Sequence, residues 1–110
     1  MSAADTDDIV LNDNHTKALE FLTAVQMLAE PSPANVAAVL DTSVTAFRRI
    51  PKMCFDYFGV RVLKGTVSGQ RKQIFMVVDW GFINKEAVCA FYSPSLAQTA
   101  RAKGIALKVE

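Results

Sequence analysis

Residues 37–50 read AAVLDTSVTAFRRI, and this stretch decides the fold. An apolar run ends at Leu40, a polar turn follows at Asp41 and Thr42, and Ser43 stands where it can cap a new helix. Leu40 is placed to fill the core beneath the turn. Asp41 is among the better non-glycine residues for a position that needs a positive φ. The stretch therefore predicts two helices joined by a tight turn.

Two helices are predicted on the amino-terminal side of the turn. A first helix, residues 14–30, carries an apolar stripe at spacings of three and four, with Asn14 as its cap. The residues of the stripe are Ala18, Phe21, Leu22, Val25 and Leu28. Pro31 ends this helix, and Ser32 caps a second one that begins with Pro33 and runs to Leu40.

A third helix is expected from Ser43 to a glycine stop near Gly59. Its inward residues are Ala46, Phe47, Ile50, Cys54 and Phe58. Residues 60–64 and 73–80 then read as two strands around a glycine-containing loop, which predicts a β-hairpin.

The carboxyl-terminal third is predicted to hold further helices. Asn84 is placed to cap a helix, Pro94 is expected to break it, and residues 95–103 follow as another helix that ends at Gly104. Residues 105–109 alternate in the manner of a short strand.

The order of helix, short helix, tight turn, helix and basic hairpin resembles the winged helix-turn-helix of bacterial LysR-type and MarR-type regulators. Their common pattern is A-x-x-L-G-V-S-x-x-T-V-S-R, and Ala37, Leu40 and Ser43 match it, while Asp41 occupies the glycine position. Gly59 follows about sixteen residues after Ser43, as the glycine before the wing does in those families. The resemblance covers residues 14–82 and implies an α+β fold, with a three-helix core, a β-hairpin wing and extra C-terminal helices.

The chain divides into three predicted parts. Residues 1–13 are expected to be a flexible acidic tail, residues 14–82 the winged helix-turn-helix domain, and residues 83–110 a C-terminal helical extension. The extension is a candidate dimerisation segment. Its candidate interface residues are Val88, Phe91, Tyr92 and Leu96.

Charge is distributed unevenly along the chain. Residues 31–80 carry seven bases and three acids, a local charge of +4, whereas residues 1–14 carry four acids and no base. A basic middle suits nucleic acid, although an ordinary solvated surface also accounts for it.

The resemblance implies that residues 43–51 enter the major groove of DNA. The recognition-helix candidates are Ser43, Val44, Thr45, Arg48, Arg49 and Lys52, and the wing candidates are Lys64, Arg71 and Lys72. Arg48 is the best candidate for reading a base, and Arg49 and Lys52 are assigned to phosphates. For Ser43 a structural capping role is the alternative to DNA contact.

Pro51 departs from the family pattern, because it removes a backbone N–H from the expected third helix. Either the recognition helix ends after two turns and a second short helix begins at Pro51, or the fold assignment is wrong. The first alternative is favoured, because residues 43–50 already contain the groove-reading face.

Other classes of function find little support in the sequence. One histidine and two well-separated cysteines, Cys54 and Cys89, provide no metal-ligand spacing. We expect no cofactor, no metal and no enzymatic activity, because no set of activated groups converges. The cysteines lie in apolar segments, where a buried free thiol is commoner than a disulfide. No apolar run reaches the ~20 residues of a membrane span, and the start of the chain is not a signal peptide, so a cytoplasmic protein without membrane contact is expected.

The sequence thus predicts a small transcriptional regulator that binds double-stranded DNA sequence-specifically, as a homodimer and without a small-molecule effector domain. The alternative is a winged helix used for protein–protein or RNA contact, or an accessory factor without sequence-specific DNA binding. The basic residues of the third helix and of the hairpin favour DNA.

Overall fold

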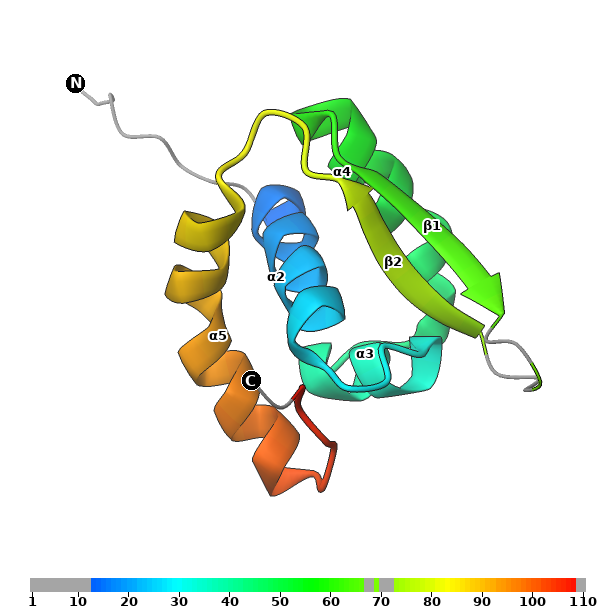
Figure 1. Ribbon diagram of the computed structural model, residues 1–110, viewed down its shortest axis with the longest axis vertical. Helices are drawn as coiled ribbons and strands as arrows, with labels where there is room; N and C mark the ends of the chain where they lie inside the picture. The colour runs from blue at the N-terminus through cyan, green and yellow to red at the C-terminus, as the bar shows by residue number, and fades with distance from the viewer. Residues whose placement is uncertain (1–12, 67–68, 70–72, 109–110) are drawn as a thin grey trace.

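The computed structural model describes residues 13–66, 69 and 73–108, which form four α-helices, one 3-10 helix and two strands (Figure 1). In chain order these are α2 (Asp13–Met27), α3 (Pro33–Leu40), η1 (Val44–Arg48), α4 (Ile50–Phe58), β1 (Arg61–Thr66), β2 (Gln73–Asp79) and α5 (Lys85–Ala102). The predicted α+β composition, with helices followed by an antiparallel hairpin, is confirmed. The predicted acidic tail lies outside the described residues, except for its last residue.

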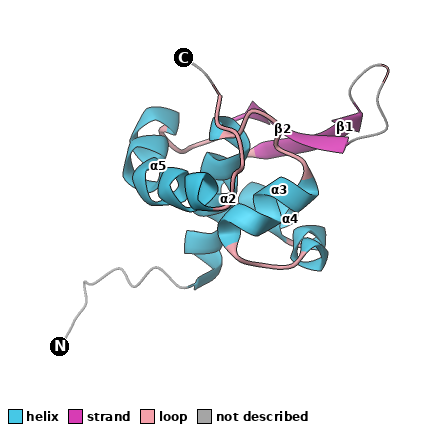
Figure 2. Ribbon diagram, turned by 90° about the horizontal axis from the view of Figure 1, so that it is seen from below, coloured by secondary structure: helices cyan, strands magenta, loops and turns pink. Residues whose placement is uncertain are grey.

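Helix α2 lies at the centre of the domain, with α5 along one side and α4 and the hairpin on the other (Figures 1 and 2). The end of the chain returns to α2: Leu28 and Leu107 form an isolated antiparallel bridge, and the Lys108 N–H donates to the Met27 carbonyl at 2.8 Å. The predicted terminal strand is therefore reduced to this bridge. Among the described residues, no helix combines the length and apolarity needed to cross a bilayer.

The start of α3 agrees with the sequence prediction. The Ser32 hydroxyl accepts a hydrogen bond from the Asn35 N–H at 3.2 Å, and Pro33 lies in the first turn. Asp41 ends the helix with φ 54° and ψ 50°, the left-handed conformation predicted for it. Helix α2 differs from its prediction at both ends, since it begins before Asn14, which is not its cap, and stops at Met27.

The predicted third helix is split into two elements. Residues 44–48 form the 3-10 helix η1, and α4 starts at Ile50 with Pro51 in its first turn, where the missing N–H needs no intrahelical partner. The helix that was expected from Pro51 is thus present, but the segment before it is not an α-helix. The prediction that Ser43 caps a helix with its side chain is wrong, because its hydroxyl hydrogen-bonds the Thr45 hydroxyl at 2.8 Å.

A break at Pro94 was predicted and is wrong, because α5 continues through this residue to Ala102. Pro94 and Ala90, four residues earlier, both lie on the exposed side of the helix, so the carbonyl that loses its partner can bond to water. On the opposite side Leu96 and Ala100 are buried in the core. Packing of this buried side holds the two halves in one helix.

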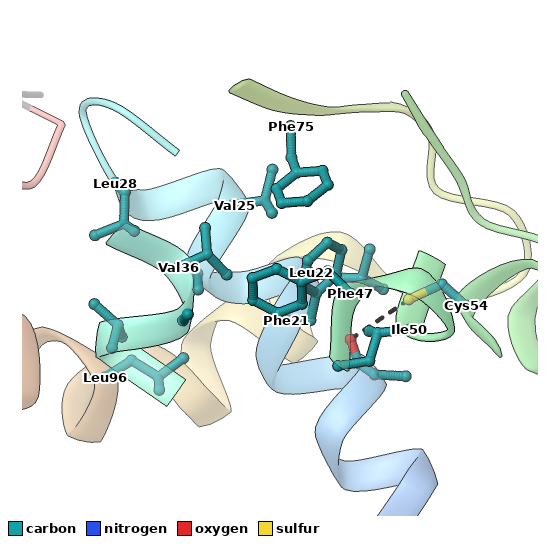
Figure 3. Close-up of a cluster of buried hydrophobic side chains, with 14 of the residues drawn as sticks. Phe21, Leu22, Val25, Leu28, Val36, Phe47, Ile50, Cys54, Phe75 and Leu96 are labelled. Atoms are coloured by element: carbon teal, nitrogen blue, oxygen red, sulfur yellow. Dashed lines mark hydrogen bonds between the residues drawn. The ribbon is translucent and has the colours of Figure 1, made fainter. Parts of the chain in front are cut away.

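Three phenylalanine rings from different elements form the centre of the core (Figure 3). Phe21 of α2 lies 5.3 Å from Phe47 of η1 and 5.0 Å from Phe75 of β2, and the last two rings are 5.4 Å apart, all measured between centroids. Two of the three pairs are edge-to-face, an arrangement that adds about 0.5–1.5 kcal/mol per pair to the burial of the rings.

The hairpin packs on the helices with one face and one edge. Val62 and Val77 pack beside Phe75 against the core, and Leu63 pairs with Met76 on the opposite face. The free edge of β2 is met by the segment between α2 and α3, because the Phe75 N–H donates to the Pro31 carbonyl at 2.9 Å. The pairing of β1 and β2 shows one irregularity, between Arg61 and Val62.

Replacing Phe47 by Ala should lower the free energy of unfolding by about 3–5 kcal/mol, because it leaves a cavity between α2 and β2. Urea denaturation followed by circular dichroism measures the change. Phe91→Ala is the matched control: this ring is 75% exposed on α5, so its removal should change stability by less than about 0.5 kcal/mol. Equal effects of the two substitutions would contradict the central place of Phe47.

Gly81 and Gly104 both have positive φ, of 60° and 71°, but only Gly81 is enclosed. A Cβ at Gly81 would overlap the Phe58 carbonyl and the backbone of Gly59, whereas nothing lies within 4 Å of a Cβ at Gly104. Gly81→Ala should cost about 3 kcal/mol or more, and Gly104→Ala about 1–2 kcal/mol for strain alone. Thermal denaturation of both variants measures the difference in stability. Equal losses in the two variants would show that the segment around Gly81 relaxes to accommodate a Cβ.

Candidate nucleic-acid interface

The residues predicted to read DNA lie on one continuous surface segment, formed by Ser43, η1, the residue after η1 and the first turn of α4. All six are exposed: Ser43, Val44, Thr45, Arg48, Arg49 and Lys52. The segment is anchored from below, since Phe47 and Ile50 point into the core. A buried side thus fixes this segment while its polar side faces solvent.

The three bases of the segment differ in their surroundings. The Lys52 ammonium lies 2.8 Å from the Asp56 carboxylate, one turn further along α4, and both side chains are well exposed. Such a surface pair is worth little and can exchange partners easily. The side chains of Arg48 and Arg49 form no hydrogen bond or ion pair with another described residue.

The loop end of the hairpin lies beside η1. Val44 lines a shallow pocket together with Thr66 of β1 and Gln73 of β2, the residues that flank the loop. Lys64 is exposed on β1, with its Nζ 5.8 Å from the centroid of the Phe75 ring. The remaining wing candidates, Arg71 and Lys72, lie outside the described residues.

A second hollow, of about 300 Å³, opens between α2, the turn after α3 and α4. Its floor includes Leu40 and Met53, and two bases line it: Lys17 of α2 and Arg49. Burial raises the pKa of Glu20, which also lines the hollow. Lys17 thus joins the candidate interface through the tertiary structure. Sequence analysis alone does not identify Lys17, because this residue lies on the helix that supplies the core stripe and far from Arg49 in sequence.

The residues named for dimer contact mostly face inward. Leu96 is buried, and Val88 and Tyr92 are half-buried, because α5 packs along α2. Of this set only Phe91 is exposed, at 75%. Helix α5 therefore does not present a continuous stripe of these four side chains to a partner.

No group of three metal-ligating side chains occurs in the part of the chain that the structure describes. Both cysteines are free thiols, and the Cys54 Sγ donates to the Ala18 carbonyl at 3.7 Å (Figure 3). Burial raises the pKa of Cys54 to about 12, so the thiol stays protonated and unreactive near neutral pH. Burial also raises the pKa of Cys89.

Comparison with protein-family models, with curated proteins and with solved structures finds no match to this chain. What the chain does must therefore be inferred from its own residues and their geometry.

Alkylation of the native protein by iodoacetamide at pH 8 should modify Cys89 before Cys54, because Cys54 is buried and its pKa is raised to about 12. Mass spectrometry of the digested protein measures the ratio. In urea both thiols should react at similar rates, which serves as the control. Faster reaction of native Cys54 would contradict its burial beneath α2.

Proposed function

We propose that this domain is a winged helix-turn-helix that binds double-stranded DNA sequence-specifically and catalyses no reaction. In this proposal η1 and the first turn of α4 face the major groove, and the β1–β2 hairpin is the wing. One observation carries the proposal: an exposed segment with two arginines, which form no ion pair with another described residue, lies beside the loop end of a hairpin that carries further bases.

The connections between the elements support this arrangement. Asp41 makes the left-handed turn between α3 and η1, where the related bacterial pattern has glycine. The hairpin follows α4 after Gly59, and the Phe75–Pro31 hydrogen bond adds the segment before α3 to the edge of β2. The pair of short helical elements and the hairpin are thereby held against the same core.

The proposed roles follow from the chemistry of each group. Arg48, which ends η1, would pair with guanine O6 and N7, the commonest specific contact in the major groove. Arg49 and Lys17, which line the same hollow, would hold phosphates on one side of the groove, and Lys52 would do so after release from Asp56. Lys64, Arg71 and Lys72 would contact the backbone from the wing.

A reading element of five 3-10 residues is short, so a single copy would contact few bases. Two copies on a two-fold repeat would double the contacts, and we include a homodimer in the proposal. Such a protein would act as a small transcriptional regulator.

A protein-docking role is the second candidate, and a specific observation favours it. Large apolar side chains are exposed on α4 and after β2: Phe55 at 56%, Tyr57 at 39% and Phe82 at 92%. Aromatic residues of this kind are enriched at protein interfaces. The cluster of Arg48, Arg49 and Lys52 together with the bases of the hairpin favours DNA, because a polyanion requires several positive charges on one surface.

Selection from a randomised duplex pool, at two salt concentrations, tests the proposal. The wild-type protein should enrich a sequence, and its affinity should fall steeply as salt rises. Arg48→Ala should weaken binding to the enriched site by about tenfold to a hundredfold and relax one position of it. The matched control is Arg101→Ala, an exposed arginine in the last turn of α5, which should change affinity less than about twofold.

The outcomes separate the candidates. Salt-sensitive binding without enrichment would replace sequence-specific regulation by an accessory role on DNA. No binding at low salt would refute the DNA proposal and leave protein docking.

A further inference from the structure

The outer face of the hairpin is apolar. Strand pairing places Leu63 opposite Met76, on the side away from the core, with Ile74 further along β2. Leu63 is 56% exposed and Met76 51%, although both lie in the middle of their strands. On the inner face Phe75, Val62 and Val77 pack on the core, and Lys64, the partner of Phe75, lies on the same face.

The apolar surface extends toward the end of the hairpin that is remote from the loop. Val78, at the irregularity in the pairing, is 49% exposed. Phe82 follows at 92%, with its ring against Gly59 and its N–H bonded to the Phe58 carbonyl at 2.9 Å. Short backbone contacts thus hold an aromatic ring in water at the end of the hairpin.

An antiparallel sheet with one face on the core ordinarily has polar residues on the other face. A sheet that is apolar on both faces is typical of one that is covered on both sides. Clustered exposed apolar side chains on a small domain mark a contact surface. The outer face is therefore a candidate contact surface for another molecule.

The charges at the end of the hairpin indicate which molecule binds the outer face. Arg61 is paired in register with Asp79. The Arg61 side chain makes no ion pair with another described residue, and the Asp79 carboxylate accepts the Gly81 N–H at 2.9 Å. One positive and one negative group thus lie side by side at one end of an otherwise apolar face. Two copies of this face can therefore pair the positive group of one copy with the negative group of the other.

We infer that the outer hairpin face is a homodimer interface in which two copies pack face to face about a two-fold axis parallel to the strands. This axis places β1 of one copy over β2 of the other. Leu63 then faces Met76 of the partner subunit, and Arg61 faces Asp79 of the partner subunit. An axis perpendicular to the strands would instead place Arg61 against the loop end of the other copy, so the charges select the parallel axis.

The interface is small. Strands of six and seven residues are about 20 Å long, and neighbouring strands lie about 4.8 Å apart, so the face of two strands is well below the ~800 Å² per partner of a standard interface. A weak dimer that dissociates readily on dilution is therefore expected. The axis brings the loop ends of both hairpins, and η1 beside each, to the same end of the dimer.

Sedimentation equilibrium of the full chain, from about 5 to 500 µM, tests the interface. The wild-type protein should dimerise within this range, and Met76→Glu should raise the dimer dissociation constant more than about tenfold, because it buries a charge. Phe91→Glu is the control on the exposed face of α5 and should dimerise as the wild type does. A monomeric wild type, or loss of the dimer in Phe91→Glu alone, would overturn the inference.

A charge exchange tests the axis and keeps the inference testable should Met76→Glu fail to fold. Arg61→Asp and Asp79→Arg should each be monomeric, because like charges then meet across the axis. Their equimolar mixture should recover the dimer, because each changed residue then meets an opposite charge. Circular dichroism checks that both variants are folded; a mixture of folded variants that stays monomeric would refute the proposed axis.

The interface does not depend on DNA binding, and the two proposals fail separately. Loss of the dimer in Met76→Glu with retained, weaker DNA binding supports both. A wild type that is monomeric and still enriches a DNA sequence refutes the interface and the homodimer of the proposed function, and it leaves the DNA binding itself standing.

Discussion

The contact among Phe21, Phe47 and Phe75 is the constraint on which the other features of this domain depend. The three rings come from α2, η1 and β2, and their centroids lie 5.0–5.4 Å apart. Local sequence gives Phe21 no reason to meet Phe75, which lies 54 residues further along the chain. The rings bury a large apolar area only when the central helix, the surface segment and the hairpin come together.

This contact also explains how so short an element as η1 can be held in place. A five-residue 3-10 helix has poor intrinsic stability, and Ser43 provides no side-chain cap. Phe47 anchors it from below, and α4 restarts the chain at Ile50 with Pro51 in a tolerated position. The exposed arginines at its end are therefore presented from a fixed base, as the proposed contact with DNA requires.

The two faces of the hairpin have different surroundings. Its inner face carries Phe75 and completes the core of the domain. Its outer face, with Leu63 and Met76, is left in water by a single copy of the chain. A two-stranded sheet is marginal on its own, so cover on both faces would also stabilise the hairpin itself.

The sequence by itself determined the features that depend on neighbouring residues. The Ser32 cap, the left-handed Asp41, the stop at Gly59, the two strands and the cap at Asn84 each follow from local backbone chemistry. The exposure of the six residues near the turn also followed, because Phe47 and Ile50 mark the buried side of that segment.

Tertiary structure decided what local chemistry leaves open. Pro94 remains inside α5, because packing of Leu96 and Ala100 outweighs one lost hydrogen bond on the exposed side. The predicted third helix became η1 and α4, because Phe47 must reach Phe21 while Cys54 lies under Ala18. Lys17 and Arg49 line the same hollow between helices. These three features cannot be predicted from local sequence, because each depends on contacts between residues that are far apart in the chain.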